Sequence, residues 1–196
     1  MTALGQLGRD AVTTEQLAGD IADACVRIDT EMPAFKEYHL GVGPYGEPQL
    51  VKQVAEFLNE LPPYVGKAKS KRNPDLLIKG LWALEFKIAR PFGDNGLESE
   101  HWSENLLHPY PGNVSVFGDC LKLERWDGPE RKAAVVIGYE HHPAKISLTP
   151  LLNAFDALAD RILPVHLLPR CEVTRRDLRH PVHEVLRVIV WELADK

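Results

Sequence analysis

The stretch Asn73-Pro74-Asp75-Leu76-Leu77-Ile78-Lys79-Gly80-Leu81-Trp82-Ala83-Leu84-Glu85-Phe86-Lys87 decides how the middle of this chain folds. Apolar runs on both sides of a Lys-Gly pair predict two strands, at about residues 75–78 and 81–88, joined by a tight turn. Asp75, Glu85 and Lys87 interrupt these apolar runs. They form either the polar face of a half-exposed strand pair or the charged groups of a metal site.

The length of the turn decides which of these side chains share a face of the sheet. A strict two-residue turn would point Asp75 away from Glu85 and Lys87, because cross-strand partners lie on the same face. A three-residue loop, Ile78-Lys79-Gly80 with its glycine left-handed, pairs Asp75 with Ala83 instead. We expect this loop, or a bulge with the same effect, because it brings the three charged groups to one face.

A helix is predicted before the hairpin, and Glu47 lies in its first turn. Pro48 suits the start of a helix. Apolar residues follow at helical spacing, namely Leu50, Val54, Phe57, Leu58 and Leu61, and two prolines end the helix. Glu47 lies three residues before the first of these and seven before the second. It therefore projects from the N-terminal end of the buried stripe.

The remaining elements are predicted from caps and periodicity. We expect a helix from the Thr13 cap to about Ile28, a helix capped by Asn113, a buried strand at 132–139, a helix from Thr149 and Pro150, a short strand near Val165 and a last strand at about 185–193. From Glu47 to Tyr139 we expect the order helix, strand, strand, strand, helix, strand, in which the hairpin supplies two of the first three strands. This order predicts an α/β fold.

Length and composition set the class of protein. With 196 residues, 44% hydrophobic and 26% charged, the chain suits a single soluble domain over residues 1–196, with the motif-bearing core at about 46–140. No signal peptide or membrane-spanning run is visible, so we expect a cytoplasmic protein without a membrane partner. Cys25, Cys120 and Cys171 are odd in number and far apart, which favours reduced core thiols.

The charge of the chain is unevenly distributed. The formal net charge is -5, which argues against indiscriminate binding of nucleic acid. Residues 67–90, however, contain seven basic residues and only two acidic ones. The basic residues are Lys67, Lys69, Lys71, Arg72, Lys79, Lys87 and Arg90. Such a stretch can hold a polyanion locally. The alternative is a solvated basic loop.

The hairpin and its helix resemble the PD-(D/E)xK nuclease superfamily. Pro74-Asp75 is similar to its PD, Glu85-Phe86-Lys87 to its (D/E)xK, and Glu47 to the acidic residue that many members carry on a helix. The resemblance covers about the middle half of the chain. It implies a restriction-endonuclease-like αβββαβ core with a mixed central sheet flanked by helices. The first helix and the C-terminal helix and strands are then additions to this core.

Phosphodiester hydrolysis gives these residue types a chemical role. Asp75 and Glu85 are expected to bind Mg²⁺, with Mn²⁺ as a substitute, because hard divalent cations prefer carboxylate ligands. The Phe86 carbonyl is a further candidate ligand, and Glu47 would bind directly or through water. Lys87 would orient or deprotonate the attacking water and stabilise the transition state. The predicted function is a Mg²⁺-dependent nuclease that acts on DNA.

Alternatives remain at each position. Glu85 and Lys87 are also typical of the wet face of an edge strand, Asp75 of a turn, and Glu47 of a helix start that interacts with the helix dipole. For the whole chain, the alternative is an inactive module of the same fold that binds nucleic acid or a protein. A different enzyme with a coincidental motif and a homodimer are also left open.

Overall fold

The computed structural model describes residues 12–110 and 115–194 of the chain. The helices in these ranges are α1 (Thr14–Glu31), α2 (Glu47–Leu58), a 3₁₀ turn (Pro62–Tyr64), α3 (Glu104–Leu107), α4 (Val116–Glu124) and α5 (Thr149–Ile162). The strands are β1 (Ala68–Ser70), β2 (Leu76–Ile78), β3 (Trp82–Ala89), β4 (Arg131–Glu140), β5 (His166–Leu167), β6 (Cys171–Arg175) and β7 (Val185–Ala194).

The strands form one open, mixed sheet. Its order is β1-β2-β3-β4-β7-β5, and β6 pairs with β7 along the same edge as β5. β3 and β4 are parallel over the whole length of β3, while every other pairing is antiparallel. The two parallel strands are connected through α3 and α4, as a parallel pair requires a crossover.

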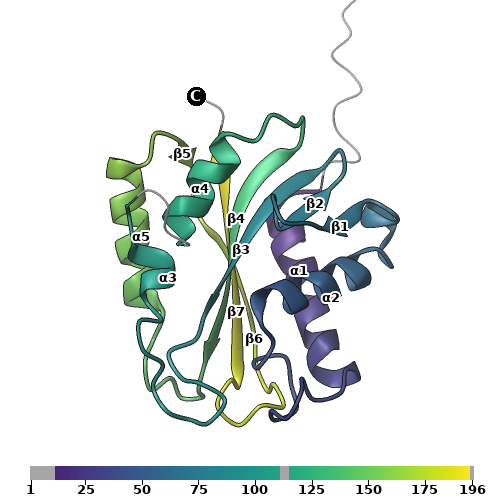
Figure 1. Cartoon of the computed structure of the whole chain (residues 1–196), viewed down its shortest axis with the longest axis vertical. Coiled ribbons are helices and arrows are strands. Elements are labelled where there is room, and N and C mark those ends of the chain that lie inside the picture. Colours follow the sequence, from purple (N-terminus) through teal and green to yellow (C-terminus); the bar gives the residue numbers. More distant parts are fainter. Residues whose placement is uncertain (1–11, 111–114, 195–196) are drawn as a thin grey trace, which may run out of the picture.

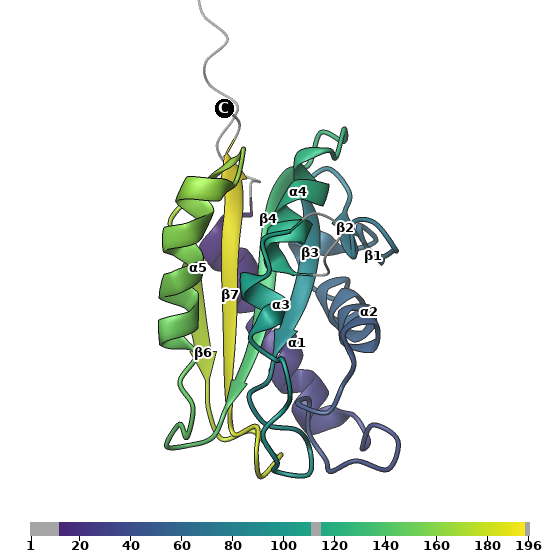
Figure 2. The same ribbon diagram turned by 60° about the vertical axis from the view of Figure 1, so that its left-hand side comes forward.

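Helices cover both faces of this sheet (Figures 1 and 2). α1 and α2 pack on one face, and α3, α4 and α5 pack on the other. The side chains of β3 alternate between the two cores, as a strand buried on both faces requires. Leu84, Phe86 and Ile88 enter the core under α1 and α2, whereas Ala83 and Ala89 enter the other core.

The predicted α/β class is confirmed, and most predicted elements are present. α1 begins at the Thr13 cap, whose side chain accepts a hydrogen bond from the Gln16 amide at 3.1 Å. α5 begins at Thr149, as expected. The predicted cap Asn113 lies outside the described residues, and α4 is capped instead by Ser115. β6 was not predicted, so the expectation of a single short strand between α5 and β7 was wrong.

The turn between β2 and β3 differs from the prediction by one position. Ile78 pairs with Trp82, so the three-residue loop is Lys79-Gly80-Leu81 rather than residues 78–80. Gly80 has the predicted left-handed conformation, with φ of +73°. Continuing this register sets Asp75 opposite Glu85 instead of Ala83. Asp75 and Glu85 still lie on one face of the sheet, as the predicted loop required.

β3 is not an edge strand. It runs between β2 and β4, and all of its eight residues are buried. Glu85 is 1% exposed and Lys87 is 7% exposed. This burial excludes the interpretation of the two residues as the wet face of an edge strand.

The structure also bears on the cysteines and on the expected lack of a membrane-spanning helix. Cys25, Cys120 and Cys171 are free thiols, and Cys25 and Cys120 lie in the core as predicted, whereas Cys171 is only partly buried. None of the described helices combines the length and the apolar character needed to cross a membrane.

Candidate functional site

The candidate site begins at the β2–β3 hairpin. Asp75 ends the loop before β2, and its Oδ2 accepts a hydrogen bond from the backbone amide of Phe86 at 2.9 Å. This bond fixes the Asp75 carboxylate beside β3, on the face that carries Glu85 and Lys87. The hairpin therefore brings together the three charged residues that the sequence singled out.

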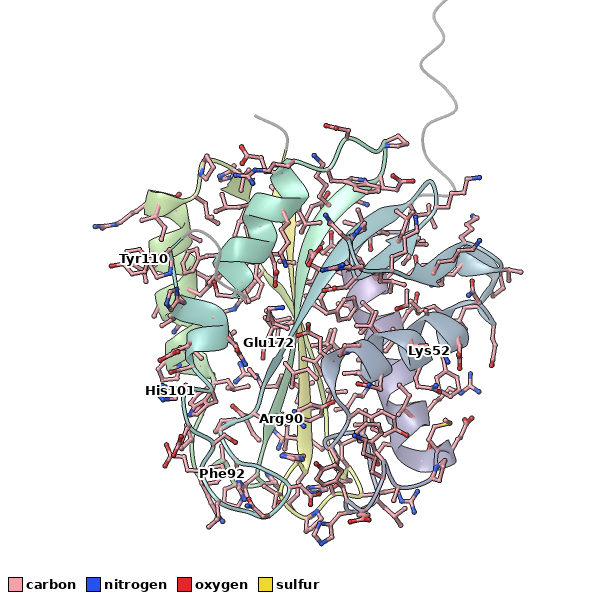
Figure 3. The ribbon with its side chains drawn as sticks, viewed as in Figure 1. Lys52, Arg90, Phe92, His101, Tyr110 and Glu172 are labelled. Atoms are coloured by element: carbon pink, nitrogen blue, oxygen red, sulfur yellow. The ribbon has the colours of Figure 1, made fainter. Side chains whose placement is uncertain are left out.

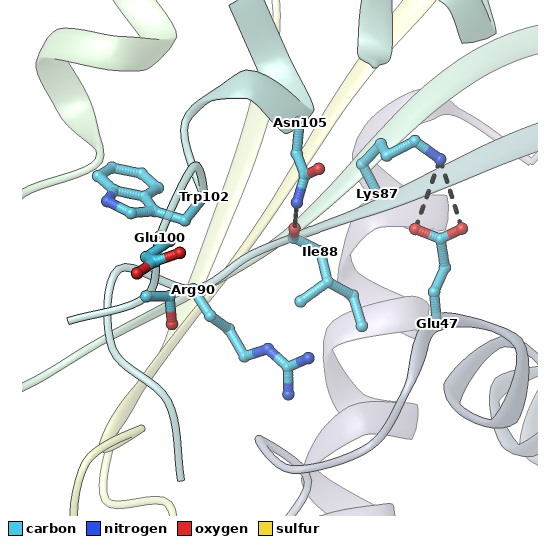
Figure 4. A pocket seen from close by; sticks show the side chains of 8 residues that line it. Glu47, Lys87, Ile88, Arg90, Glu100, Trp102 and Asn105 are labelled. Atoms are coloured by element: carbon cyan, nitrogen blue, oxygen red, sulfur yellow. Dashed lines mark hydrogen bonds and ion pairs between the residues drawn. The ribbon is translucent and has the colours of Figure 1, made fainter. Parts of the chain in front are cut away.

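Lys87 connects this hairpin to both helical layers. Its Nζ lies 3.3 Å from Glu47 Oε1 in the first turn of α2 and 3.1 Å from Asp119 Oδ2 in α4. It also donates to the Phe86 carbonyl at 2.9 Å. Figure 4 shows the contacts to Glu47. Burial alone would lower the pKa of Lys87, but Asp119 and Glu47 outweigh it, and the pKa is raised. Lys87 is therefore a fixed ammonium group.

Glu85 is held in an unfavourable environment. Its Oε2 lies 3.3 Å from Lys122 Nζ, while its Oε1 is buried and has no hydrogen-bond partner in the described part of the chain. Burial and the negative charge of Asp75 raise the pKa of Glu85 to about 8, with a smaller contribution from Asp119. These effects exceed the opposing attraction of Lys122. The ion pair with Lys122 therefore compensates the Glu85 charge only in part.

Asp119 and Lys122 belong to the site but were missed in the sequence. Asp119 is 1% exposed, and its Oδ1 lies 2.7 Å from Lys122 Nζ. A signal for Asp119 was present, because it lies three residues after Val116 and four before Leu123, both of which are buried. This is the same argument that placed Glu47 on a buried stripe. No comparable signal marks Lys122.

The site forms a chain of alternating charges in which each lysine bridges two carboxylates. Lys87 lies between Glu47 and Asp119, and Lys122 lies between Asp119 and Glu85. Among the described residues, no three of the site carboxylates bring oxygen atoms within 4.8 Å of one another. The Phe86 carbonyl, a predicted ligand, accepts a hydrogen bond from Lys87. The ammonium groups of Lys87 and Lys122 thus lie beside the carboxylates, where the sequence predicted a metal cation.

The carboxylates nevertheless suit a divalent cation. Oxygen donors are what Mg²⁺ and Mn²⁺ prefer, and Glu85 Oε1 is a buried acceptor that no group in residues 12–110 or 115–194 satisfies. A buried unpartnered carboxylate oxygen is costly. A cation bound to Glu85 would remove that cost.

Two hollows flank the site. One, of about 360 Å³, is lined by Glu47, Lys87, Ile88, Arg90, Ser99, Glu100, Trp102 and Asn105 (Figure 4). The other, of about 250 Å³, is lined by Glu47, Pro48, Val51, Ser70, Lys71, Arg72 and Asp75. Glu47 lines both hollows, so it lies at their junction.

Three of the five basic residues predicted to bind nucleic acid line one of the two hollows. Lys71 and Arg72 line the hollow beside Asp75, and Arg90 lines the hollow beside Lys87. Lys69 is exposed on β1, and Lys67 is exposed and donates to the Pro63 carbonyl at 3.0 Å. Neither Lys67 nor Lys69 lines either hollow.

The loops near Arg90 are held by a separate cluster of histidines. Figure 3 shows Arg90 and Phe92 toward the lower end of the sheet. Asp94 Oδ1 lies 2.7 Å from His180 Nε2 and 3.2 Å from His39 Nδ1. In the described part of the chain this is the one group of three potential ligands within 4.8 Å.

The hydrogen bonds of His180 argue against a metal at this cluster. His180 Nδ1 accepts hydrogen bonds from the backbone amides of Val182 and His183, so the ring proton is on Nε2 and is donated to Asp94. A ligating histidine normally donates its second N–H to an acceptor, and here that position faces two donors. The cluster is therefore a structural clamp between loops.

Comparisons with protein-family models, with curated proteins and with solved structures gave no match. The chemistry of the site itself is therefore the basis for inferring a function.

Proposed function

We propose that this protein is a Mg²⁺-dependent nuclease that hydrolyses phosphodiester bonds in DNA. The supporting observation is the convergence of Asp75, Glu85 and Lys87 from one hairpin with Glu47 from α2. A binding surface alone has no need of buried carboxylates next to the phosphates of its ligand.

The fold supports the same proposal. From α2 to β4 the chain follows the order helix, strand, strand, strand, helix, strand, apart from the 3₁₀ turn after α2 and the short helix α3. We propose that this segment is a restriction-endonuclease-like core. The acidic helix residue, the hairpin and the Glu-Phe-Lys run occupy the corresponding elements of that core.

Each residue of the chain has a distinct role in this proposal. Asp75 and Glu85 would hold the cation together with the Phe86 carbonyl, and Glu47 would complete the site. A bound divalent cation would supply Lewis acidity and lower the pKa of a water molecule. Lys87 keeps its proton, since its pKa is raised. It therefore stabilises negative charge on the phosphoryl group and orients water rather than accepting a proton.

The two hollows define a path for one nucleic-acid strand. Lys71 and Arg72 on one side, and Arg90 on the other, would contact phosphates on either side of the bond that is cut. Glu47 lies at the midpoint of this path. Trp102 lines the hollow beside Lys87, where an unpaired base can stack.

A second candidate is supported by the two lysines. Lys87 and Lys122 compensate the carboxylates without a metal, as expected of an inactive nuclease-fold module that binds nucleic acid or a protein. Two properties predicted from the sequence, a homodimer and a cytoplasmic location, stay predictions.

The two candidates are separated by one set of assays. Circular and linear DNA, single- and double-stranded, is incubated with the full chain in Mg²⁺, Mn²⁺ or EDTA. The nuclease proposal predicts cleavage in the metals, none in EDTA, and none with Glu85→Ala. Glu124→Ala is a matched control, because this glutamate is exposed on α4. DNA binding without cleavage under all conditions would select the inactive module instead.

A further inference from the structure

Lys122 occupies a position between two almost fully buried carboxylates. Its Nζ lies 2.7 Å from Asp119 Oδ1 and 3.3 Å from Glu85 Oε2. The two acidic side chains are 2% and 1% exposed, whereas the Lys122 side chain is 43% exposed. The ammonium group therefore enters the site from solvent, while its partners are fixed inside the protein.

Lys87 provides the contrast. Its side chain is 9% exposed, and its ammonium group contacts Glu47, Asp119 and the Phe86 carbonyl. It has no comparable route to solvent. Of the two lysines, Lys122 alone can leave the site by rotation of an exposed side chain, at the loss of two ion-pair contacts.

A second observation points to a ligand at the same place. Glu85 Oε1, on the carboxylate whose other oxygen contacts Lys122, is buried and has no hydrogen-bond partner among the described residues. An ammonium group on one oxygen leaves this acceptor unsatisfied. A divalent cation binds a carboxylate through one or both oxygens and carries twice the charge.

We infer that Glu85 and Asp119 form a divalent-cation subsite, and that the Lys122 ammonium group occupies it until a cation displaces it. This inference deepens the proposed nuclease function and rests on it for the role of Glu85. It adds Asp119 as a ligand that the nuclease motif does not include. It also makes Lys122 a competitor of the metal rather than a catalytic residue.

Removal of the competitor should tighten cation binding. Lys122→Met keeps the length and the apolar stem of the side chain but removes the charge that a cation must displace. Glu85 then loses its ion-pair partner, while Asp119 keeps its contact with Lys87 at 3.1 Å. We expect the dissociation constant for Mn²⁺ to fall by about tenfold or more, which is about 1.4 kcal/mol of binding free energy.

The test measures Mn²⁺ binding without DNA. Free Mn²⁺ is followed by electron paramagnetic resonance during titration of the full chain at fixed pH and ionic strength. The variants are Lys122→Met, Asp119→Asn and the double variant. The control is Lys52→Met, because this exposed lysine pairs with Glu56 at 3.9 Å on α2 and lies outside the site. Lys122→Met should bind more tightly, the double variant should lose this gain, and the control should match the wild type.

Two results would overturn the inference. One is unchanged Mn²⁺ affinity in Lys122→Met, and in Lys122→Gln if the methionine variant does not fold. The other is a gain that survives Asp119→Asn. If the wild type binds Mn²⁺ through Glu85 and cuts DNA but Asp119 has no effect, only this inference fails. If the Asp119-dependent gain appears in a protein that never cuts DNA, only the nuclease function fails.

Discussion

Replacement of Glu85 by glutamine should stabilise the metal-free protein, and increasingly so as the pH rises. Glu85 is 1% exposed, and burial together with Asp75 raises its pKa to about 8. In the unfolded chain its pKa is about 4.3. Between these values the folded state holds a proton that the unfolded state has lost. The free energy of unfolding therefore falls as the pH rises through this window.

The magnitude follows from the two pKa values. Each unit of pKa difference corresponds to about 1.4 kcal/mol. Between pH 5 and pH 8 the wild type should lose roughly 3 kcal/mol of stability through Glu85 alone. Glu85→Gln has no proton to lose and keeps a similar shape. For a chain of this length the difference corresponds to roughly 6–12 °C in melting temperature.

The assay is thermal unfolding followed by circular dichroism in EDTA, at constant ionic strength and at pH 5, 6, 7 and 8. The quantity of interest is the difference in melting temperature between Glu85→Gln and the wild type, since other titrating groups cancel in it. Glu124→Gln, an exposed substitution on α4, should show no such trend.

Parallel curves of melting temperature against pH for the wild type and Glu85→Gln would refute the raised pKa of Glu85. If the wild type and Glu85→Gln differ by the same amount at pH 5 and pH 8, then Glu85 does not carry a raised pKa. A variant that becomes less stable than the wild type at pH 8 would show that the ion pair with Lys122 outweighs burial.

Further predictions concern catalysis, binding and packing. Lys87→Ala should reduce cleavage by a factor on the order of 10² or more while Mn²⁺ binding persists, and cleavage at the wild-type rate would remove the motif as an active site. Lys71→Ala should lower DNA affinity modestly and reduce its salt dependence by about one phosphate contact, as measured by binding titrations at several salt concentrations. In urea unfolding, Gly43→Ala should destabilise by about 1–3 kcal/mol, because its methyl group would lie 2.2 Å from His183 Nδ1. Gly19→Ala, which has open space in α1, should not destabilise.

The elements that were predicted well have strong local signals. α5 combines a proline in its first turn with a regular apolar stripe, and β7 is a long apolar run. β6 has a signal too, since Cys171 and Val173 alternate with exposed residues. The prediction did not use this alternation. The one-residue error in the β2–β3 turn arose because two loop positions give the same face.

The candidate site was only partly predictable for a different reason. Asp75, Glu85 and Lys87 lie within one hairpin, so the sequence specifies their relation through strand geometry. Asp119 and Lys122 reach the hairpin only because α4 packs over β3. That packing depends on the whole crossover between β3 and β4, for which no short-range pattern exists. The ion pairs that Lys87 and Lys122 form with the carboxylates are therefore a finding of the structure alone.

Because β3 pairs with a strand on each side, the register of the β2–β3 hairpin restricts which changes in turn length preserve the site. β4 fixes β3 along its whole length, so β3 cannot move when the adjoining turn is altered. A residue inserted at Gly80 can lengthen the turn only while β2 keeps its register. If β2 slides by one residue instead, Asp75 turns away from Glu85 and Leu76 leaves its core. A slide of two residues would restore both, so changes of register that keep the site should occur in steps of two residues.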